Sequence, residues 1–517
     1  MKIGLFLENR KIRNIDLSRP EEGNPGIGGT EYMFVSMPYY FKKLISDDTE
    51  FVYYTLNETQ LDGKFSTVRC DDCYDAYVKC SQSDCDIFIW RPVENKENWY
   101  LIHNIDKFKL PAIAWVHNTL SEKMLNTLAE KTNIKRYVTV SQEQLDILRH
   151  HPIINKACTI YNGFDPDTVE TRPITEKDPN MVVYVGSMIK AKGFGLLARA
   201  WKKILLQHPS AQLYVIGSGK LYNRDQQLGP WNVADEAFES QEIRPFLSDE
   251  KGGILPSVHF LGVLGKEKNE YLAKAQVGVV NPSALTENCP GSALEFQASN
   301  TPVVSRCDWG LLDTVINNKT GRLGTTEDAL VDNILFFLKN PQEAYRYGKA
   351  GREFVSRKFD YETIVTQWKT LFEEVIDGKQ AVIPLIEENI FFRRKWLREL
   401  IRLSRRELHK DKIVKPFDEE SDILKLIAVQ QSLSQFVQAM SPENQDTYEK
   451  YLGNHSKIGE ENKFLLEKLQ EKNELLTKKQ KEIDKRDLQL SQILNSKKYK
   501  LAKLLAYPFT LIKRIVQ

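Results

Sequence analysis

The sequence predicts an α/β protein of two lobes, each formed by a parallel sheet with helices on both faces, followed by an α-helical extension. Two observations predict the lobes. Short β-rich runs alternate with helical stretches over roughly the first 375 residues, which is the pattern of parallel sheets covered by helices. In addition, a chain of 517 residues with 41% hydrophobic content is too long for a single core and indicates two or three domains.

The strand candidates fall into two sets. The first set is KIGLFL, FVYYTL, DIFIW, AIAWVH and YVTVS, and the second is MVVYVGS, AQLYVIGSG, VHFLG, VGVVNPS and PVVSR. Between them, NGFDPDTVETRPITEKDPN is rich in Pro, Asp and Thr and has no apolar periodicity, as expected of a linker. We therefore place the boundary near residue 170, with a first lobe over residues 1–170 and a second lobe over residues 171–378.

After residue 378 the sequence changes to long charged helices. Residues 379–450 are predicted to form a basic amphipathic helical region, and residues 451–517 a coiled-coil-like helix with a basic amphipathic tail. Within residues 391–412 the apolar side chains share one helical stripe among nine Lys or Arg and three acids. Apolar residues also recur every seven positions, at Leu469, Leu476, Ile483 and Leu490. The other half of this seam is polar, so the predicted coiled coil is weak.

The composition argues against nucleic-acid binding as the main role. The chain has 72 basic and 70 acidic residues and a formal net charge of +2, which does not suit a protein that coats nucleic acid. Seven cysteines are too sparse for a disulfide framework, so a reducing cytoplasm is the expected setting. We expect neither a signal peptide nor a membrane-spanning helix, because the apolar runs near both ends are short.

Two glutamates flank a Pro-Gly step in the segment TENCPGSALEFQASNTPVVS. Proline favours a helix start, so we expect a helix from about Gly291, with Glu287 in the preceding loop and Glu295 in the second turn. Free N–H groups at the helix start attract an anion, and a glycine allows a ligand close to the backbone. A sugar nucleotide has the matching parts, with its diphosphate at the helix start, sugar hydroxyls on Glu287 and the ribose on Glu295. A surface loop with an ordinary solvated glutamate is the alternative, and the spacing alone does not decide between them.

This segment resembles the Glu-x7-Glu segment of the family 4 glycosyltransferases, and other motifs stand in the order of that family. They are GNPGIGGTEY after the first strand, then AWVHN, YVTVSQEQ, TIYNGFD, YVGSMIKAKGF, LYVIGSG and VGVVNPS. The ordered set is far more specific than any one member. The resemblance implies two Rossmann-like lobes in the GT-B arrangement and retaining transfer of a sugar from a nucleotide-sugar donor to an acceptor hydroxyl.

The resemblance also implies site residues. Gly28 and Gly29 match the glycine turn beside the donor sugar and the acceptor, where glycines permit positive φ and close backbone approach; a plain turn without ligand is the alternative. His117 matches the family histidine that faces the reacting side of the sugar, and it is predicted to be catalytic together with Glu287. An isolated histidine is more often structural, and the matching WVHN context favours the site. The predicted donor-binding residues of the second lobe are Ser187, Lys190, Lys192, Asn288, Cys289, Pro290, Gly291 and Glu295.

The segment GSMIKAKG departs from the family's phosphate-binding pattern at one position. Lys192 matches the family lysine, and its charge would neutralise the leaving nucleoside diphosphate. The family's arginine position holds Ser187, which puts the usual clamp of two cations in doubt. Lys190 is a candidate substitute, with a solvated loop charge as the alternative. The sequence offers no convincing metal ligands for the diphosphate, so we expect transfer without a metal or other cofactor.

Four cysteines lie close together in CDDCYDAYVKCSQSDCD. Cys70, Cys73, Cys80 and Cys85 could in principle bind zinc as thiolates. The second pair lacks the usual close spacing, however, and Cys73 and Cys80 suit one face of a helix as small apolar residues. We therefore favour packing over a zinc site.

The predicted partners are a nucleotide sugar, a glycan acceptor and a membrane. Residues 391–412 and the acid-free terminus KKYKLAKLLAYPFTLIKRIVQ resemble surfaces that lie on anionic lipid, which fits a lipid-linked acceptor in surface polysaccharide synthesis. We therefore expect a cytoplasmic protein, peripheral on the inner face of the cell membrane, unless the 391–412 stripe packs on the body instead. The heptads could form a homodimer, bind a partner enzyme or act as a spacer. Two other functions stay open: an enzyme for soluble acceptors, and a non-catalytic scaffold.

Overall fold

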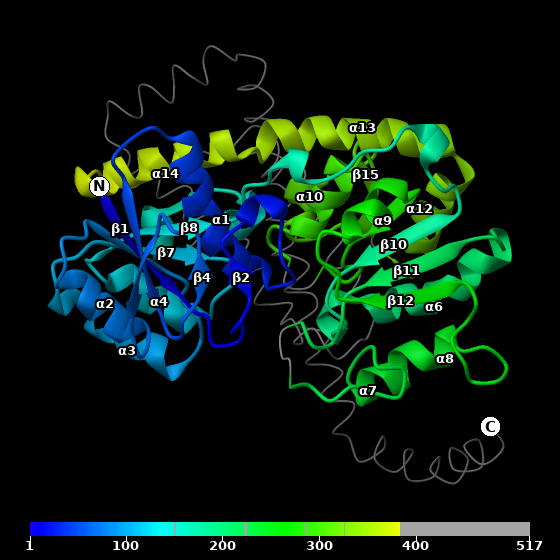
Figure 1. Ribbon diagram of the computed structural model, residues 1–517, viewed down its shortest axis with the longest axis horizontal. Helices are drawn as coiled ribbons and strands as arrows, with labels where there is room; N and C mark the ends of the chain where they lie inside the picture. Colours follow the sequence, from blue (N-terminus) through cyan, green and yellow to red (C-terminus); the bar gives the residue numbers. More distant parts are fainter. Residues whose placement is uncertain (149–150, 222–224, 285–286, 325, 383–517) are drawn as a thin grey trace, which may run out of the picture. The chain divides into compact units, whose positions relative to one another are not determined.

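The computed structural model describes residues 1–148, 151–221, 225–284, 287–324 and 326–382 (Figure 1). These described residues all belong to one compact unit. The predicted amphipathic segment and the heptad residues of the predicted coiled coil lie outside the described residues.

The first lobe is built on a seven-stranded sheet in which every pairing is parallel. Its strand order is β5-β3-β1-β6-β7-β8-β9, so the order reverses between β1 and β6. Leu5 of β1 lies opposite Tyr53 on one side and Ile89 on the other, and all three side chains are buried. Helices on both faces bury these strands, which explains their nearly continuous apolar sequences. The strands are β1 (Lys2–Leu7), β3 (Glu50–Thr55), β5 (Ser66–Arg69), β6 (Ile87–Trp90), β7 (Ala112–Val116), β8 (Ile134–Thr139) and β9 (Ala157–Thr159).

The second lobe contains a six-stranded sheet that is also parallel throughout. Its order is β12-β11-β10-β13-β14-β15, with the reversal between β10 and β13. In such sheets, ligands bind outside the carboxyl ends of the strands at the point of reversal. The strands are β10 (Met181–Val185), β11 (Gln212–Ile216), β12 (Val258–Gly262), β13 (Val277–Val279), β14 (Val303–Arg306) and β15 (Gly321–Gly324). A separate two-stranded ribbon joins β2 (Asp16–Leu17) and β4 (Gln60–Leu61).

Helices alternate with the strands, and several begin at residues that cap them. The side chains of Asp72, Ser121 and Thr326 accept hydrogen bonds from backbone N–H groups in the first turns of α2, α4 and α12, which otherwise have no partner within the helix. The helices of the first lobe are α1 (Gly29–Leu44), α2 (Cys73–Ser81), α3 (Lys96–Asn104), α4 (Glu122–Glu130) and α5 (Gln142–Asp146). The later helices are α6 (Phe194–Gln207), α7 (Glu236–Phe238), α8 (Arg244–Leu247), α9 (Lys268–Lys274), α10 (Gly291–Ala298), α11 (Leu311–Thr314), α12 (Glu327–Lys339), α13 (Pro341–Lys358) and α14 (Tyr361–Ile376).

The predicted α/β class with two parallel-sheet lobes is confirmed, and all ten quoted strand candidates contain strands. Sequence patterns missed the edge strands β5, β9 and β15. β5 has a polar, mostly exposed sequence, and β15 has glycines at both ends. Edge strands bury fewer side chains, so their apolar signal is weaker.

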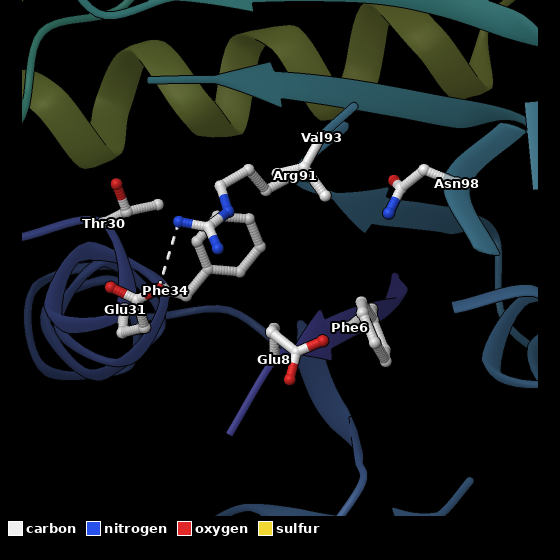
Figure 2. Close-up of a pocket in the computed structure, with 8 residues that line it drawn as sticks. All are labelled: Phe6, Glu8, Thr30, Glu31, Phe34, Arg91, Val93 and Asn98. Atoms are coloured by element: carbon white, nitrogen blue, oxygen red, sulfur yellow. Dashed lines mark ion pairs between the residues drawn. The ribbon is translucent and has the colours of Figure 1, made fainter. Parts of the chain in front are cut away.

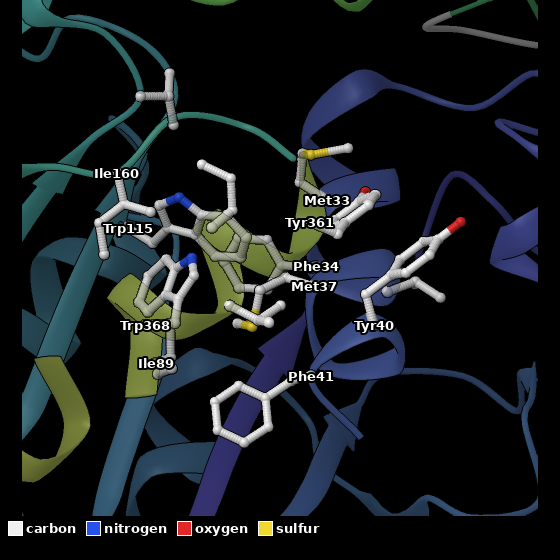
Figure 3. Close-up of a cluster of buried hydrophobic side chains, with 14 of the residues drawn as sticks. Met33, Phe34, Met37, Tyr40, Phe41, Ile89, Trp115, Ile160, Tyr361 and Trp368 are labelled. Carbon is white, nitrogen blue, oxygen red and sulfur yellow. The ribbon is translucent and has the colours of Figure 1, made fainter. Parts of the chain in front are cut away.

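The last described helix, α14, packs on the first lobe, although the sequence placed its residues in the second. Figure 3 shows Trp368 beside Trp115 and Tyr361 beside Tyr40, in a cluster with Phe34. The ring centroids of Trp115 and Trp368 lie 4.8 Å apart, and those of Tyr40 and Tyr361 lie 3.7 Å apart in a stacked pair. The apolar face of α14 therefore completes the core between α1 and the first sheet, a long-range contact that no local pattern reveals.

The linker between the sheets is anchored to the second lobe by a buried lysine. The ammonium group of Lys177 donates hydrogen bonds to the carbonyl oxygens of Ala273 and Ala275 and to the hydroxyl of Thr301, at 2.9, 3.2 and 2.8 Å. Burial lowers the pKa of Lys177 to about 7. The free part of the linker is consequently shorter than its sequence composition suggests.

Candidate functional site

The candidate site residues of both lobes follow the carboxyl ends of strands. In the first lobe His117 comes directly after β7, and in the second lobe Ser187 and Asn281 follow β10 and β13. The strands β10 and β13 flank the point where the order of the second sheet reverses. Parallel strands bring these positions to one edge of each sheet, where ligands of doubly wound folds bind.

Glu287 forms an ion pair with Lys192, 95 residues earlier in the chain. Both side chains are 13% exposed, and the side-chain amide of Asn281 donates a further hydrogen bond of 3.0 Å to the same carboxylate. α10 begins at Gly291, so Glu287 lies in the loop before it and Glu295 lies in its second turn, as predicted. The two residues predicted to contact the sugar and the phosphates therefore lie together.

Glu295 forms a second ion pair, with Lys268 of α9 at 2.7 Å, and these side chains too are 13% exposed. Lys268 was not among the predicted residues. It lies 27 residues before its partner, in a helix whose sequence has no recognisable site pattern. Only the packing of α9 beside α10 reveals it.

The loop before α10 also contacts the first lobe. The side-chain amide of Asn288 donates to the carbonyl oxygen of His117 at 2.7 Å, and that of Asn162 donates to the carbonyl oxygen of Cys289 at 3.4 Å. Asn288 and Cys289 are buried, as is Pro290 at the start of the helix. Gly291 is exposed, and a Cβ there would have no atom within 4 Å. The backbone at Gly291 is therefore open to a ligand.

His117 is buried, with 7% of its surface exposed. Burial, reinforced by the nearby charge of Arg91, lowers the pKa of His117 to about 3. Its ring lies against Trp115 and Phe34, with centroids 4.9 and 6.1 Å away. Both ring nitrogens lack a hydrogen-bond partner of ordinary geometry among the described residues. A neutral imidazole of this kind can donate one hydrogen bond to a ligand and accept another.

Neither Gly28 nor Gly29 uses the positive φ that glycine permits. Gly28 has φ −58° and caps α1, and Gly29 is the first residue of that helix. The positive φ belongs to Gly26, at 86°. The absence of a side chain still matters at Gly28, because a Cβ there would lie 2.2 Å from a carboxylate oxygen of Glu31. Gly28 therefore has a close contact that only glycine allows, whereas the role of this turn beside the donor and the acceptor stays a prediction.

Ser187 and Lys190 are the two positions considered for a second cation, and their contacts differ from those of Lys192. The hydroxyl of buried Ser187 donates to the carbonyl oxygen of Ser218 at 3.4 Å. Lys190 is half exposed and pairs with Glu242 at 2.7 Å, which favours the solvated-charge interpretation. Gly193, which ends the turn after Lys192, has φ 69°, and a Cβ there would lie 2.4 Å from the backbone nitrogen of Ser283. Only glycine fits at this position, so the turn that contains Lys192 can pack closely against the loop after β13.

A pocket lies at the point of reversal in the first sheet, after β1 and β6 (Figure 2). Arg91 and Glu31 form an ion pair of 3.1 Å on its wall, and Figure 2 shows this pair facing Glu8. Burial is the main cause that raises the pKa of Glu8 above its ordinary value. Asn98, from the first turn of α3, completes the polar lining. Sequence analysis singled out none of these four residues, because their common location depends on the order of the strands.

The cysteine cluster is part of the first core. Cys70, Cys73 and Cys80 are buried among apolar residues, and Cys85 is half-buried. Burial raises the pKa of Cys70 to about 12 and is also the main cause that raises the pKa of Cys73, which disfavours the thiolates that zinc requires. Within the described part of the chain, no group of three or more His, Cys, Asp or Glu is placed to hold a metal ion. Over the same residues, no helix is both long and apolar enough to cross a bilayer.

The second lobe is similar in sequence to a known family. Residues 168–354 match the family described as "Glycosyl transferases group 1". This match covers about a third of the chain, so residues 168–354 are similar to group 1 glycosyltransferases. The matched region includes the donor-side residues Lys192, Glu287 and Glu295, whereas His117 and the pocket of the first lobe precede it. The predicted fold of two Rossmann-like lobes is confirmed, and the similarity of the second lobe to glycosyltransferases agrees with the predicted class of enzyme.

Related sequences share the region of the glycosyltransferase lobes. An uncharacterized glycosyltransferase of Methanocaldococcus jannaschii is 22% identical over 331 residues, which cover 54% of this chain and 74% of the relative. A glycogen synthase of Mycobacterium tuberculosis is 26% identical over 244 residues, which cover 46% of this chain. The latter match spans about half of the glycogen synthase, 53% of its length.

Solved structures with similar folds support the GT-B arrangement. The sucrose-phosphate synthase from Thermosynechococcus elongatus matches with a TM-score of 0.53 and 18% identity, over 73% of this chain and 100% of that chain. HepE of Anabaena, solved in complex with UDP, matches with a TM-score of 0.51 and 16% identity, over 72% of this chain and 100% of that chain. At these identities the likeness concerns the fold.

Proposed function

We propose that this protein is a glycosyltransferase that moves a sugar from a nucleotide-sugar donor to a hydroxyl group of an acceptor, with retention of configuration at the anomeric carbon. The observation that carries the proposal is the meeting of Lys192 with Glu287 beside the start of α10, in a loop that also contacts His117. This arrangement offers a cation, a carboxylate and free backbone N–H groups within one small region. Their chemistry matches the diphosphate and the hydroxyls of a nucleotide sugar. The complexes of a structural neighbour with UDP lend further support.

In this proposal the donor separates the Lys192–Glu287 ion pair and leaves the Lys268–Glu295 pair in place. Lys192 turns from Glu287 to the diphosphate, and Glu287 accepts hydrogen bonds from sugar hydroxyls. Glu295 accepts those of the ribose while Lys268 holds the carboxylate in place. Without a ligand, the charges of Lys192 and Glu287 neutralise each other although both are mostly removed from water. The bound donor then supplies a new partner for each of them.

The proposed reaction occurs on one face of the sugar. The acceptor oxygen forms a bond to the anomeric carbon as the bond to the diphosphate breaks, and the leaving phosphate takes the proton of the acceptor hydroxyl. Lys192 and the N–H groups at the start of α10 stabilise the charge that develops on the leaving group, without a metal ion. Neutral His117 orients the sugar by hydrogen bonds, because its low pKa leaves it without charge at neutral pH. Positioning by the two lobes supplies the remaining acceleration.

The proposed acceptor is a lipid-linked glycan in the synthesis of a surface polysaccharide. The basic segments 391–412 and 497–517 of the sequence support this proposal, since clusters of Lys and Arg among apolar residues bind anionic lipid surfaces. The enzyme would then act in the cytoplasm, peripheral on the inner face of the membrane. The heptads beyond residue 450 are proposed to join two copies or to bind a partner enzyme.

The test is a panel of nucleotide sugars incubated with the full chain, first alone and then with either lipid-linked or soluble acceptors. We expect one donor to raise the melting temperature and to release its nucleotide faster with a lipid-linked acceptor. The anomeric configuration of the product, read by proton NMR, checks retention, and an EDTA-treated sample checks independence from metal. Equal activity on soluble acceptors favours an enzyme without a carrier, and no binding of any donor would leave the scaffold interpretation.

A further inference from the structure

Two cysteines of the first lobe lie at the edge of the buried cysteine cluster. Cys80 is in the last turn of α2, and Cys85 is in the short connection between α2 and β6. Cys80 is fully buried, whereas Cys85 is half-buried between the exposed residues Asp84 and Asp86. Because Cys85 precedes β6, it lies at the amino ends of the parallel strands, on the opposite edge of the sheet from His117. The proposed transfer reaction uses neither cysteine.

The packing of strands β1 and β3 brings the two sulfur atoms to one place. A Cβ at Gly4 of β1 would lie 2.3 Å from the Sγ atom of Cys80, so only glycine leaves room for this sulfur. The ring of Tyr54, from β3, lies 3.0 Å from the same Cβ position. The hydroxyl group of Tyr54 lies 3.9 Å from the Sγ atom of Cys85, within hydrogen-bond distance for sulfur. Both sulfur atoms therefore lie around the side chain of Tyr54.

The two thiols also contact each other. A hydrogen bond between Cys80 and Cys85 is the largest cause that lowers the pKa of Cys85, to about 6. Hydrogen bonds with Ser83 and Tyr54 and the positive charge of Lys2 lower it further, while partial burial opposes them. The bond to Cys85 is also the largest cause that raises the pKa of Cys80. At neutral pH Cys85 therefore carries the charge, and a thiolate is the form of cysteine that reacts with oxidants.

We propose that Cys85 is a site of reversible oxidation by hydroperoxides, and that Cys80 converts the oxidised residue to a disulfide. In the first step a lone pair on the Cys85 sulfur attacks one oxygen of hydrogen peroxide, and the O–O bond breaks. The sulfur becomes a sulfenic acid, and the other oxygen leaves as hydroxide and takes a proton from the solvent.

In the second step the sulfur of Cys80 attacks the sulfur of Cys85. An S–S bond forms and the S–O bond breaks, and the hydroxide that leaves takes the thiol proton of Cys80. The two sulfur atoms together lose two electrons, and the peroxide is reduced to two molecules of water. A thiol such as glutathione restores both cysteines by thiol–disulfide exchange.

The environment of the two thiols sets the order of these steps. Cys80 is fully buried, so a peroxide in solution reaches the half-buried Cys85 first. The sulfenic acid of Cys85 is neutral, so the first step removes the largest cause that raises the pKa of Cys80. Cys80 then ionises more readily and can attack its oxidised neighbour.

The test exposes the full chain to hydrogen peroxide at neutral pH, blocks the remaining free thiols and locates the oxidised residues by mass spectrometry. Trypsin cleaves after Lys79 and Lys96, and the peptide of residues 80–96 contains only these two cysteines. We expect this peptide to lose two hydrogen atoms, as an internal disulfide requires, and to regain them with dithiothreitol. Cys158 is also half-buried, but burial raises its pKa to about 12. We therefore expect Cys158 to be oxidised at least about tenfold more slowly.

Three variants assign the roles of the two cysteines. Cys80→Ser lacks the second thiol and should accumulate the sulfenic acid at Cys85, which is trapped as an adduct with dimedone. Cys85→Ser should form neither the disulfide nor the adduct within residues 80–96. Cys158→Ser is the matched control and should react as the wild type does. Thermal melting shows whether each variant folds. If Cys80→Ser does not fold, dimedone added to the wild-type chain should label Cys85 and lower the yield of the disulfide.

The proposal is overturned if residues 80–96 of the wild-type chain keep both thiols while Cys158 is oxidised, or if Cys85→Ser still forms the dimedone adduct in this peptide. A disulfide that joins two chains in place of the internal one would overturn it as well. These measurements use neither a donor nor an acceptor, so the proposal does not depend on the proposed transfer reaction.

Discussion

Glu287 and Lys192 form an ion pair in the structure, and the proposed function makes the same two residues a binding site. In the structure without ligand each charge satisfies the other, and both are largely removed from water. Such a pair adds little net stability, because the cost of desolvation offsets much of the attraction. Its position beside the start of α10 is explained better by a ligand that uses both groups.

We predict that Glu287→Gln lowers the rate of transfer by about 100-fold or more, because the amide cannot match the charge of the carboxylate when positive charge develops on the sugar. The fold should survive, since glutamine can still accept the hydrogen bond from Asn281. The measurements are kcat and the melting temperature, with Glu250→Gln at an exposed position of the same lobe as the control. Turnover within a few-fold of the wild type would remove Glu287 from the site.

Lys190 and Lys192 are two candidate contacts of the diphosphate, and substituting each in turn gives a matched comparison. We predict that Lys192→Met raises the KM for the donor about tenfold, because the phosphate loses a charged contact. Lys190→Met should change it little, because Lys190 is half exposed and paired with Glu242. Steady-state kinetics of both variants decide the point. Equal effects would restore Lys190 as the substitute for the family arginine.

His117 is predicted to stay uncharged throughout the neutral range. Its pKa of about 3 in the folded protein lies below the ordinary value near 6.5, so the unfolded chain takes up this proton first as the pH falls. Folding therefore loses stability between pH 6.5 and 3, by up to about 1.4 kcal/mol per pH unit from this group. NMR of the histidine side chains should show one imidazole with no titration between pH 8 and 5. Titration of all eight histidines near pH 6.5 would contradict the assignment.

Among the helices and strands, α14 packs in a different lobe from the one that its place in the sequence predicts. It follows α13 of the second lobe in the chain, yet Trp368, Phe372 and Val375 belong to the core of the first. The first lobe therefore depends on a helix that follows the whole second sheet in the chain. The predicted second lobe, residues 171–378, includes α14 and so does not account for this packing. The other predicted domain limits stay predictions.

We predict that Trp368→Ala destabilises the protein by about 3–5 kcal/mol, because it leaves a cavity against Trp115 in the first core. Gln367→Ala, the exposed neighbour on the same helix, should cost less than about 0.5 kcal/mol. Denaturant unfolding measures both variants. A small effect of Trp368→Ala would show that α14 is dispensable for the first lobe.

At the scale of the whole molecule, the two lobes present the ends of their strands to a loop that contacts both. The segment from Glu287 to Gly291 belongs to the second lobe, but its Asn288 and Cys289 contact the first lobe at His117 and Asn162. Donor binding in this loop would therefore change the contacts of the loop with the first lobe. This is the physical basis for expecting binding of the donor and of the acceptor to be coupled.

The C-terminal part of the chain is predicted to bind the protein to a membrane surface. Six Lys or Arg and no acids among the last 21 residues should contribute about 1 kcal/mol each near an anionic surface. Deletion of residues 456–517 should abolish sedimentation with vesicles that contain phosphatidylglycerol, whereas neutral phosphatidylcholine vesicles should bind neither form. Salt should weaken binding of the full chain. Unchanged partition after the deletion would argue against the anchor.

The sequence by itself determined the features that depend on local pattern. Buried parallel strands need continuous apolar runs, so ten strands could be located, and a Pro-Gly step is enough to place the start of α10. Glu287, Lys192 and His117 could be named because each lies in a motif that is continuous in the chain.

Tertiary structure decided which of these residues meet and which residues join them. Lys268 reaches Glu295 from another helix, and Arg91 reaches Glu31 across the first sheet, so neither pair leaves a pattern in the sequence. The conformation of Gly28 likewise followed from the start of α1 rather than from its glycine neighbours. These features depend on strand order and helix packing, which are set by contacts between distant parts of the chain, and local propensity carries no record of such contacts.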